Sequence, residues 1–188
     1  PIFENSNHRL CGQNIKYDAL VLSRYDIHLA NMVFDTMVAE YMLHPEKNSY
    51  KMDYLAIDYL KYRMVPIDDL IGTGLHQKSM AEVPLEDIAF YASEDADIAF
   101  QLTKILKDKL EEESLFEPYN DIEIPLIPVL TTIEKNGVYL DLDFLADLSR
   151  QFGEGLEKLT EKIHQMAGRE FNINSPKQLG EVLFDELE

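Results

Sequence analysis

The sequence has a single cysteine and few basic residues, and each shortage excludes a class of protein. One cysteine, Cys11, rules out an internal disulfide and a zinc site built on cysteines. The 17 Lys and Arg residues face 35 Asp and Glu, and the net charge of −18 makes the chain by itself a poor electrostatic binder of nucleic acid. No apolar run approaches the roughly 20 residues of a membrane span, and no signal peptide is present. These features favour a cytoplasmic location.

The 188 residues are enough for one domain or two small ones with a buried core. Five scattered histidines offer no His-paired metal motif. The chain begins at Pro1 without an initiator Met, and the segment opened by the capping box Ser175–Gln178 reaches Glu188 without a helix stop. We therefore expect these residues to be a piece of a longer protein.

Hydrophobic periodicity predicts a mainly helical α/β protein in two units, residues 1–113 and 114–188. The longest helical pattern starts after Pro84 and ends in the acidic run Glu111–Glu113, and we place the boundary just beyond it. The predicted helices cover residues 14–25, 36–43, 52–62, 84–113, 122–136 and 145–168, and the predicted short strands cover residues 8–12, 32–34 and 138–140.

A candidate metal-dependent site lies in the longest helix, in the run Tyr91–Asp97. Tyr91 and Asp95 are four positions apart, so they share a helix face at the margin of the apolar stripe. A partly buried carboxylate needs a counter-charge, which a divalent cation supplies, and a phenol beside it can orient a metal-bound water. Ordinary packing is the alternative, with Tyr91 at the edge of the core and Asp95 as a surface acid.

A second candidate is the run Gly12–Asp18 at the start of a predicted helix. Gln13, Asn14 and Tyr17 carry hydrogen-bonding or stacking groups suited to phosphates and bases, and Asp18 is a second candidate metal ligand. The structural alternative is that Asn14 caps the helix while Asp18 complements the dipole of its first turn.

Two other acidic runs lack what a metal pair requires. Asp35 ends a predicted strand, but the residue two positions later, Met37, stands where a paired Glu is needed. Asp121 and Glu123 are two positions apart, but they fall in the predicted connection between the units and not on a strand.

Taken together and in this order, the motifs resemble the bacterial family A DNA polymerases, the DNA polymerase I family. The run Gly12–Asp18 is similar to the second motif of their proofreading 3′→5′ exonuclease domain. The run Tyr91–Asp97 is similar to the third motif, the Tyr-x-x-x-Asp form of the tyrosine branch of the DEDD exonucleases. Further matches to the exonuclease domain are Phe34–Tyr41, Met52–Ala56 and Gly72–Gly74, and matches to the start of the polymerase domain are Glu123–Leu130, Ile133–Val138 and Phe171–Leu179.

The resemblance implies a truncated ribonuclease H-like exonuclease domain in residues 1–113, followed by helices of the polymerase domain that lead into its thumb. It implies a DNA-directed DNA polymerase with proofreading activity in DNA replication and repair. Two Mg²⁺ or Mn²⁺ ions would be the cofactors, with Asp18 and Asp95 as two of their four carboxylate ligands and Tyr91 orienting the attacking water. The single-stranded 3′ end of a DNA primer would be the partner, contacted by Gln13, Asn14 and Tyr17.

The family's first motif, Asp-x-Glu on an opening strand, is expected before Pro1, and the polymerase palm and fingers are expected beyond Glu188. With half of one metal site, we expect the isolated chain neither to degrade DNA nor to extend a primer, and to hold no ordered metal. Two alternatives stay open. A ribonuclease D-like exonuclease shares the Tyr-x-x-x-Asp form, although residues 123–179 argue against it, and a non-catalytic helical interaction module would use its acids for solvation alone.

Overall fold

The computed structural model describes residues 2–74 and 77–186. Their contacts define two compact units, Pro1–Gly137 and Val138–Glu188, and each unit is described by itself. Residues 114–137 belong to the first unit by their packing. Their assignment, with residues 138–188, to the start of a polymerase domain stays a prediction.

A two-stranded parallel sheet lies in the first unit, within the part of the chain that the structure describes. Strand β1 (Leu10–Gly12) pairs with β2 (Met32–Asp35), and helix α1 (Ile15–Ser23) forms part of the crossover between them. The register sets Gly12 opposite Asp35, so the carboxyl ends of both strands meet where α1 begins. The predicted strands 8–12 and 32–34 and the mainly helical α/β fold are confirmed.

Helix α2 (Thr36–Leu43) follows β2 directly, and α3 (Met52–Leu55) continues into the π-helix η1 (Ala56–Leu60). Glu40 of α2, which is fully buried, holds the loop between α2 and α3 in place. Its carboxylate accepts hydrogen bonds from the Lys47 ammonium at 2.7 Å and the Tyr59 hydroxyl at 2.8 Å. A buried carboxylate is tolerated only when it is paired in this way.

Helix α5 (Leu85–Glu112) is 28 residues long and is preceded by α4 (Ile67–Ile71) and the 3₁₀ turn η3 (Met80–Glu82). Its predicted apolar stripe is buried only in the second half, where Leu102, Leu106 and Leu110 are inaccessible to solvent. Leu85 at the start of the stripe is 80% exposed, so periodicity overstated the buried face of the first turns.

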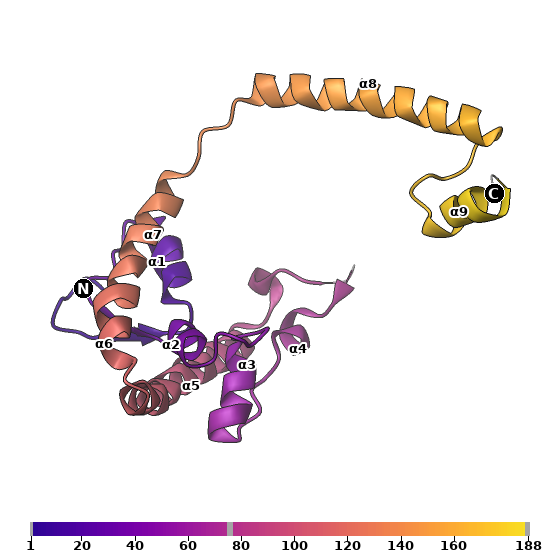
Figure 1. The fold of residues 1–188 in the computed structure, drawn as a ribbon. Helices are drawn as coiled ribbons and strands as arrows, with labels where there is room; N and C mark the ends of the chain where they lie inside the picture. The colour runs from indigo at the N-terminus through magenta and orange to yellow at the C-terminus, as the bar shows by residue number, and fades with distance from the viewer. Residues whose placement is uncertain (1, 75–76, 187–188) are drawn as a thin grey trace. The chain divides into compact units, whose positions relative to one another are not determined.

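After α5 the chain turns through α6 (Phe116–Pro118) and the π-helix η4 (Tyr119–Glu123) into α7 (Ile124–Asn136). Helix α7 lies alongside α1 (Figure 1). Gly137 ends it with φ at +70°, a conformation that glycine adopts without strain, as the sequence predicted. Tyr119 is fully buried and its ring centroid lies 4.9 Å from that of Phe34, so this segment completes the core around β2.

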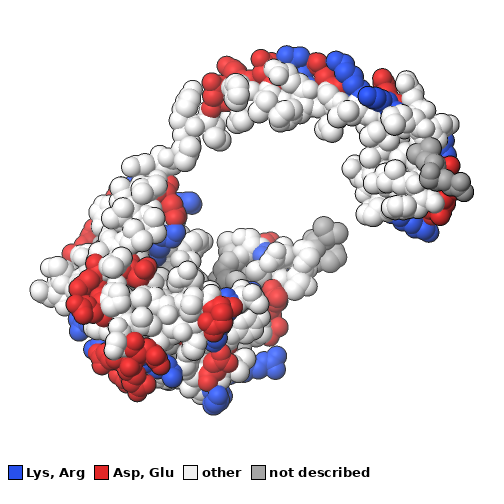
Figure 2. All heavy atoms as spheres, viewed as in Figure 1, with Lys and Arg blue, Asp and Glu red and all other residues white. Residues whose placement is uncertain are grey.

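The second unit contains α8 (Leu142–Ala167), α9 (Pro176–Glu181) and the π-helix η5 (Val182–Glu186). Figure 2 shows charged side chains along one side of α8 and uncharged atoms along the other, the amphipathic pattern expected from the sequence. The strand predicted over 138–140 is wrong, because this segment pairs with no described strand. None of the described helices combines the length and apolarity that a membrane crossing requires.

Candidate functional site

Tyr91 and Asp95 lie one helical turn apart on the half-buried face of α5. Burial and the nearby charge of Asp95 both raise the pKa of the Tyr91 hydroxyl. Burial and the charges of Glu94 and Asp53 raise the pKa of Asp95, the Tyr91 hydroxyl lowers it, and the net result is a pKa of about 6. The sequence thus predicted this pair correctly as neighbours at the margin of the core.

Asp53 of α3 is a third member of this cluster that sequence reasoning missed. Its charge raises the pKa values of both Asp95 and Tyr91, which places its carboxyl near theirs. Asp53 lies 42 positions before Asp95, and no local pattern connects the two. Only its place in a segment similar to the exonuclease domain, Met52–Ala56, could have drawn attention to it.

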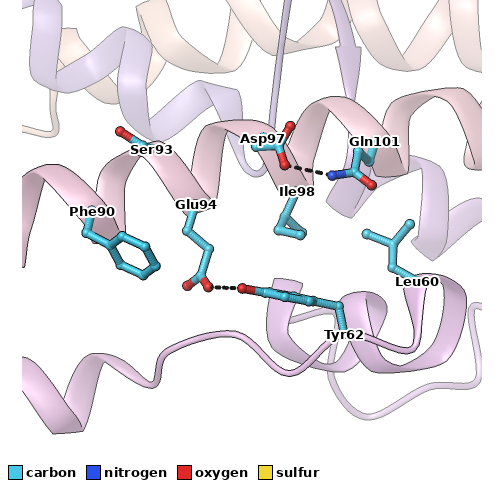
Figure 3. Close-up of a pocket in the computed structure, with 8 residues that line it drawn as sticks. All are labelled: Leu60, Tyr62, Phe90, Ser93, Glu94, Asp97, Ile98 and Gln101. Atoms are coloured by element: carbon cyan, nitrogen blue, oxygen red, sulfur yellow. Dashed lines mark hydrogen bonds between the residues drawn. The ribbon is translucent and has the colours of Figure 1, made fainter.

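Glu94, next to Asp95, points to a different side of α5 because successive helical residues are rotated by about 100°. The residue is 9% exposed, and its carboxylate accepts hydrogen bonds from the Tyr62 hydroxyl at 2.7 Å and the Val65 amide at 2.9 Å. Figure 3 shows Tyr62 and Glu94 at a cavity of about 440 Å³, with Asp97 further along the helix hydrogen-bonded to Gln101. Glu94 is thus a structural acid beside a candidate catalytic one.

Asp18 and Tyr17 lie in the first turn of α1, at the surface. Tyr17 is 63% exposed, and both side chains border a cavity of about 370 Å³ between α1 and β1. Partial burial raises the pKa of the Asp18 carboxyl, and the negative charge of Asp35 raises it further. The exposed phenol of Tyr17 is free to stack against a flat ligand.

Gln13 and Asn14 are engaged by the protein itself. The Gln13 amide donates to the Tyr50 carbonyl at 2.7 Å, and its carbonyl accepts from the Thr36 hydroxyl. Asn14 has a left-handed backbone with φ at +56°, and its side chain makes no capping hydrogen bond to α1. Asn14 is thus the N-cap residue of α1, as the structural alternative expected, but its side chain makes no capping bond and the carboxylate of Asp35 takes that place.

The two predicted metal ligands, Asp18 and Asp95, have different acidic neighbours. The charge of Asp35 contributes to the raised pKa of Asp18, whereas the charges of Glu94 and Asp53 contribute to the raised pKa of Asp95. Within residues 2–74 and 77–186, no three His, Cys, Asp or Glu side chains are grouped to hold a metal ion. Carboxylates suit Mg²⁺ in kind, but its octahedral coordination needs more ligands than these residues assemble.

The two other acidic runs also have a defined place. Asp121 and Glu123 lie in the π-helix η4 and not on a strand, as expected. Asp35 is almost fully buried with both carboxylate oxygens hydrogen-bonded to backbone amides, so neither run provides an open metal pair.

Residues 1–111 match the family model described as 3′–5′ exonuclease, and residues 142–188 match that of DNA polymerase family A. Because the first match covers more than half of the chain, the chain belongs to the 3′–5′ exonuclease family. Both clusters described above, around Asp18 and Asp95, fall within the exonuclease match.

The similar curated proteins are DNA polymerases I. Identity is 38% to that of Pseudomonas aeruginosa over 100% of this chain and 21% of the relative, and 42% to that of Chloroflexus aurantiacus over 100% and 20%. The chain thus spans about a fifth of the length of these relatives. A solved structure, the POL domain of Pol1 from M. smegmatis in complex with DNA primer-template and dNTP, matches 99% of this chain and 29% of its own. Its TM-score is 0.82 at 23% identity, which shows a shared fold.

Proposed function

We propose that this chain supplies the second and third motifs of a proofreading 3′–5′ exonuclease within a DNA polymerase I-type protein of DNA replication and repair. The observation that carries the proposal is the half-buried pair Tyr91 and Asp95, one turn apart on α5 and each shifting the pKa of the other, inside the segment that matches the exonuclease family. A carboxylate kept partly out of water beside a phenol is suited to binding and orienting a water molecule for hydrolysis.

Each residue has a role in this proposal that its surroundings support. Tyr91 holds a water molecule by its hydroxyl, and Asp95 and Asp18 are two of the four carboxylates that bind two divalent cations, Mg²⁺ or Mn²⁺. Tyr17, exposed at the start of α1, stacks on a base of the single-stranded 3′ end of DNA. Gln13 and Asn14 lie at the start of α1, which their hydrogen bonds help to fix, and both contact the same DNA end.

The remaining metal ligands are the part of the site that the described residues do not assemble. The resemblance assigns them to an Asp-x-Glu strand of the exonuclease domain. A cytoplasmic location, where DNA and nucleotides are available, belongs to the same proposal.

The proposal is tested by degradation of a 5′-labelled single-stranded DNA oligonucleotide by the full-length gene product. We expect Asp95→Ala to lower the rate at least about a hundredfold, the scale of losing a catalytic group, while primer extension at its separate site continues. Asp97→Ala is the matched control, because Asp97 is exposed on the same helix and bonded only to Gln101. Equal degradation by the Asp95→Ala variant and the unmodified protein would overturn the assignment, and a preference for RNA would favour the ribonuclease D-like alternative.

A further inference from the structure

Asp35, an acid with no part in the proposed chemistry, is bonded to the first turns of two helices. Asp35 is almost fully buried, with only 1% of its surface exposed to solvent. One oxygen, Oδ1, accepts hydrogen bonds from the backbone amides of Met37 at 2.9 Å, Val38 at 3.2 Å and Asn14 at 3.2 Å. The other, Oδ2, accepts one from the amide of Ile15 at 2.8 Å.

An N-cap residue ordinarily serves only the helix that it precedes. Asp35 caps α2 in that ordinary way and also takes the place of a side-chain cap for α1, which begins 20 positions earlier in the chain. The amino ends of both helices carry partial positive charge, which favours a carboxylate between them. Asn14 has a left-handed backbone, a conformation that asparagine adopts more readily than most residues other than glycine, and its amide donates to the same carboxylate.

Asp35 is itself held by Tyr119. The Asp35 amide donates to the Tyr119 hydroxyl at 2.7 Å, and that hydroxyl lies 3.1 Å from the Asp35 carbonyl, to which it donates. Tyr119 is fully buried. It lies beyond residues 1–111, so the anchor of the candidate site includes a residue outside the exonuclease match.

We propose that Asp35 is a positioning residue that fixes the first turn of α1, and with it Tyr17 and Asp18, for the exonuclease reaction, and that Tyr119 secures Asp35. The role in the reaction rests on the proposed function. The anchoring of α1 rests on the hydrogen bonds alone. Both oxygens of Asp35 are occupied by amides, which separates its role from that of a metal ligand.

Asp35→Asn tests the anchoring with little change of shape. With the amide nitrogen at the position of Oδ2, the three bonds to Oδ1 remain possible, and only the bond from Ile15 is replaced by two opposed N–H groups. In the 188-residue chain we expect the Ile15 amide to exchange its hydrogen about tenfold faster by NMR, as expected for loss of one charged hydrogen bond. The amides of Met37 and Val38 should change much less.

Asp141→Asn is the matched control, since Asp141 caps α8 in the second unit through one bond to the Phe144 amide. It should leave the exchange of Ile15 unchanged. If Asp35→Asn does not fold, Tyr119→Phe tests the anchoring instead. Relative to the unmodified chain, we expect this variant to accelerate hydrogen exchange at Ile15 and Met37 more than at the amides of α8. Unchanged exchange at Ile15, or equal acceleration of all amides of the first unit, would overturn the anchoring.

The reaction is tested in the full-length gene product with the same oligonucleotide and a primer–template. A positioning role lowers degradation about tenfold or more and leaves primer extension unchanged, because only the geometry of one site is lost. A merely structural role lowers the amount of folded protein and so reduces both activities together. Full degradation by Asp35→Asn, where Asp95→Ala is inactive, would overturn the positioning role. An unchanged rate of DNA degradation by Asp95→Ala would instead refute the proposed function. The anchoring would then be judged by the hydrogen exchange of the Ile15 amide alone.

Discussion

The hydroxyl of Tyr62 donates a 2.7 Å hydrogen bond to the carboxylate of Glu94, which lies 32 positions later in the chain. The second oxygen of Glu94 accepts the Val65 amide, so this one side chain ties the segment after η1 to the middle of α5. Two adjacent acids of one helix thus have different tasks. Glu94 holds the backbone in place, and Asp95 next to it faces Tyr91.

We expect Glu94→Ala to lower the free energy of unfolding by about 2 kcal/mol, because it leaves the partly buried Val65 amide without its acceptor. Urea denaturation of the 188-residue chain at pH 7 measures the change. Asp97→Ala, an exposed acid three positions along the same helix, should change the free energy by less than about 0.5 kcal/mol. Equal effects of the two substitutions would show that the buried hydrogen bonds of Glu94 contribute nothing.

The raised pKa of Asp95 predicts how stability depends on pH. Burial raises the pKa from the ordinary 3.8 to about 6, so the folded state binds this proton more tightly than the unfolded state. Between about pH 4 and pH 6 the contribution of this group to stability therefore falls as pH rises, and above pH 6 the folded state carries the full cost of the charge. Because Asp95 is only half-buried, solvent reduces this cost to about 1 kcal/mol.

Asp95→Asn should remove that cost. We expect the variant to be more stable than the unmodified chain at pH 7.5 and to differ little from it at pH 4. The measurement is the urea midpoint of both proteins across this range. Two curves that run parallel from pH 4 to pH 7.5 would contradict the raised pKa.

Tyr91→Phe should slow degradation of single-stranded DNA by the full-length gene product about tenfold to a hundredfold, since the group that orients the water is lost. The Tyr91 hydroxyl lowers the pKa of Asp95, so its removal should also move the acid limb of the pH–rate profile to higher pH. Primer extension by the same preparation is the control. A variant with unchanged rate and unchanged pH profile would remove Tyr91 from the mechanism.

The 188-residue chain by itself should bind Mg²⁺ no more tightly than about millimolar, because Asp18 and Asp95 offer two ligands to an ion that prefers six oxygen atoms. The two carboxyls also respond to different neighbouring acids, which indicates that they are not paired. Isothermal titration calorimetry measures the affinity. Micromolar binding that disappears in Asp95→Ala would show that the chain holds the ion without further ligands.

Most helices and both strands could be predicted from the sequence because their signals are local. Apolar spacing placed α5 and α8, and Gly137 with its left-handed backbone ended α7 where expected. The predicted strand 138–140 failed because a strand exists only by pairing, and a three-residue apolar run does not indicate whether a partner strand is present.

The sequence by itself determined the family and the order of the motifs, since the residues of each motif are neighbours in the chain. The pairing of Tyr91 with Asp95 follows in the same way, from their separation by one helical turn. Only the tertiary structure decided which acids are buried and what they touch. The charge of Asp53 acts on Asp95, Glu94 accepts from Tyr62, and Asp35 joins two helix ends, because the packing of distant segments sets the solvent exposure, charged neighbours and hydrogen-bond partners of each carboxylate.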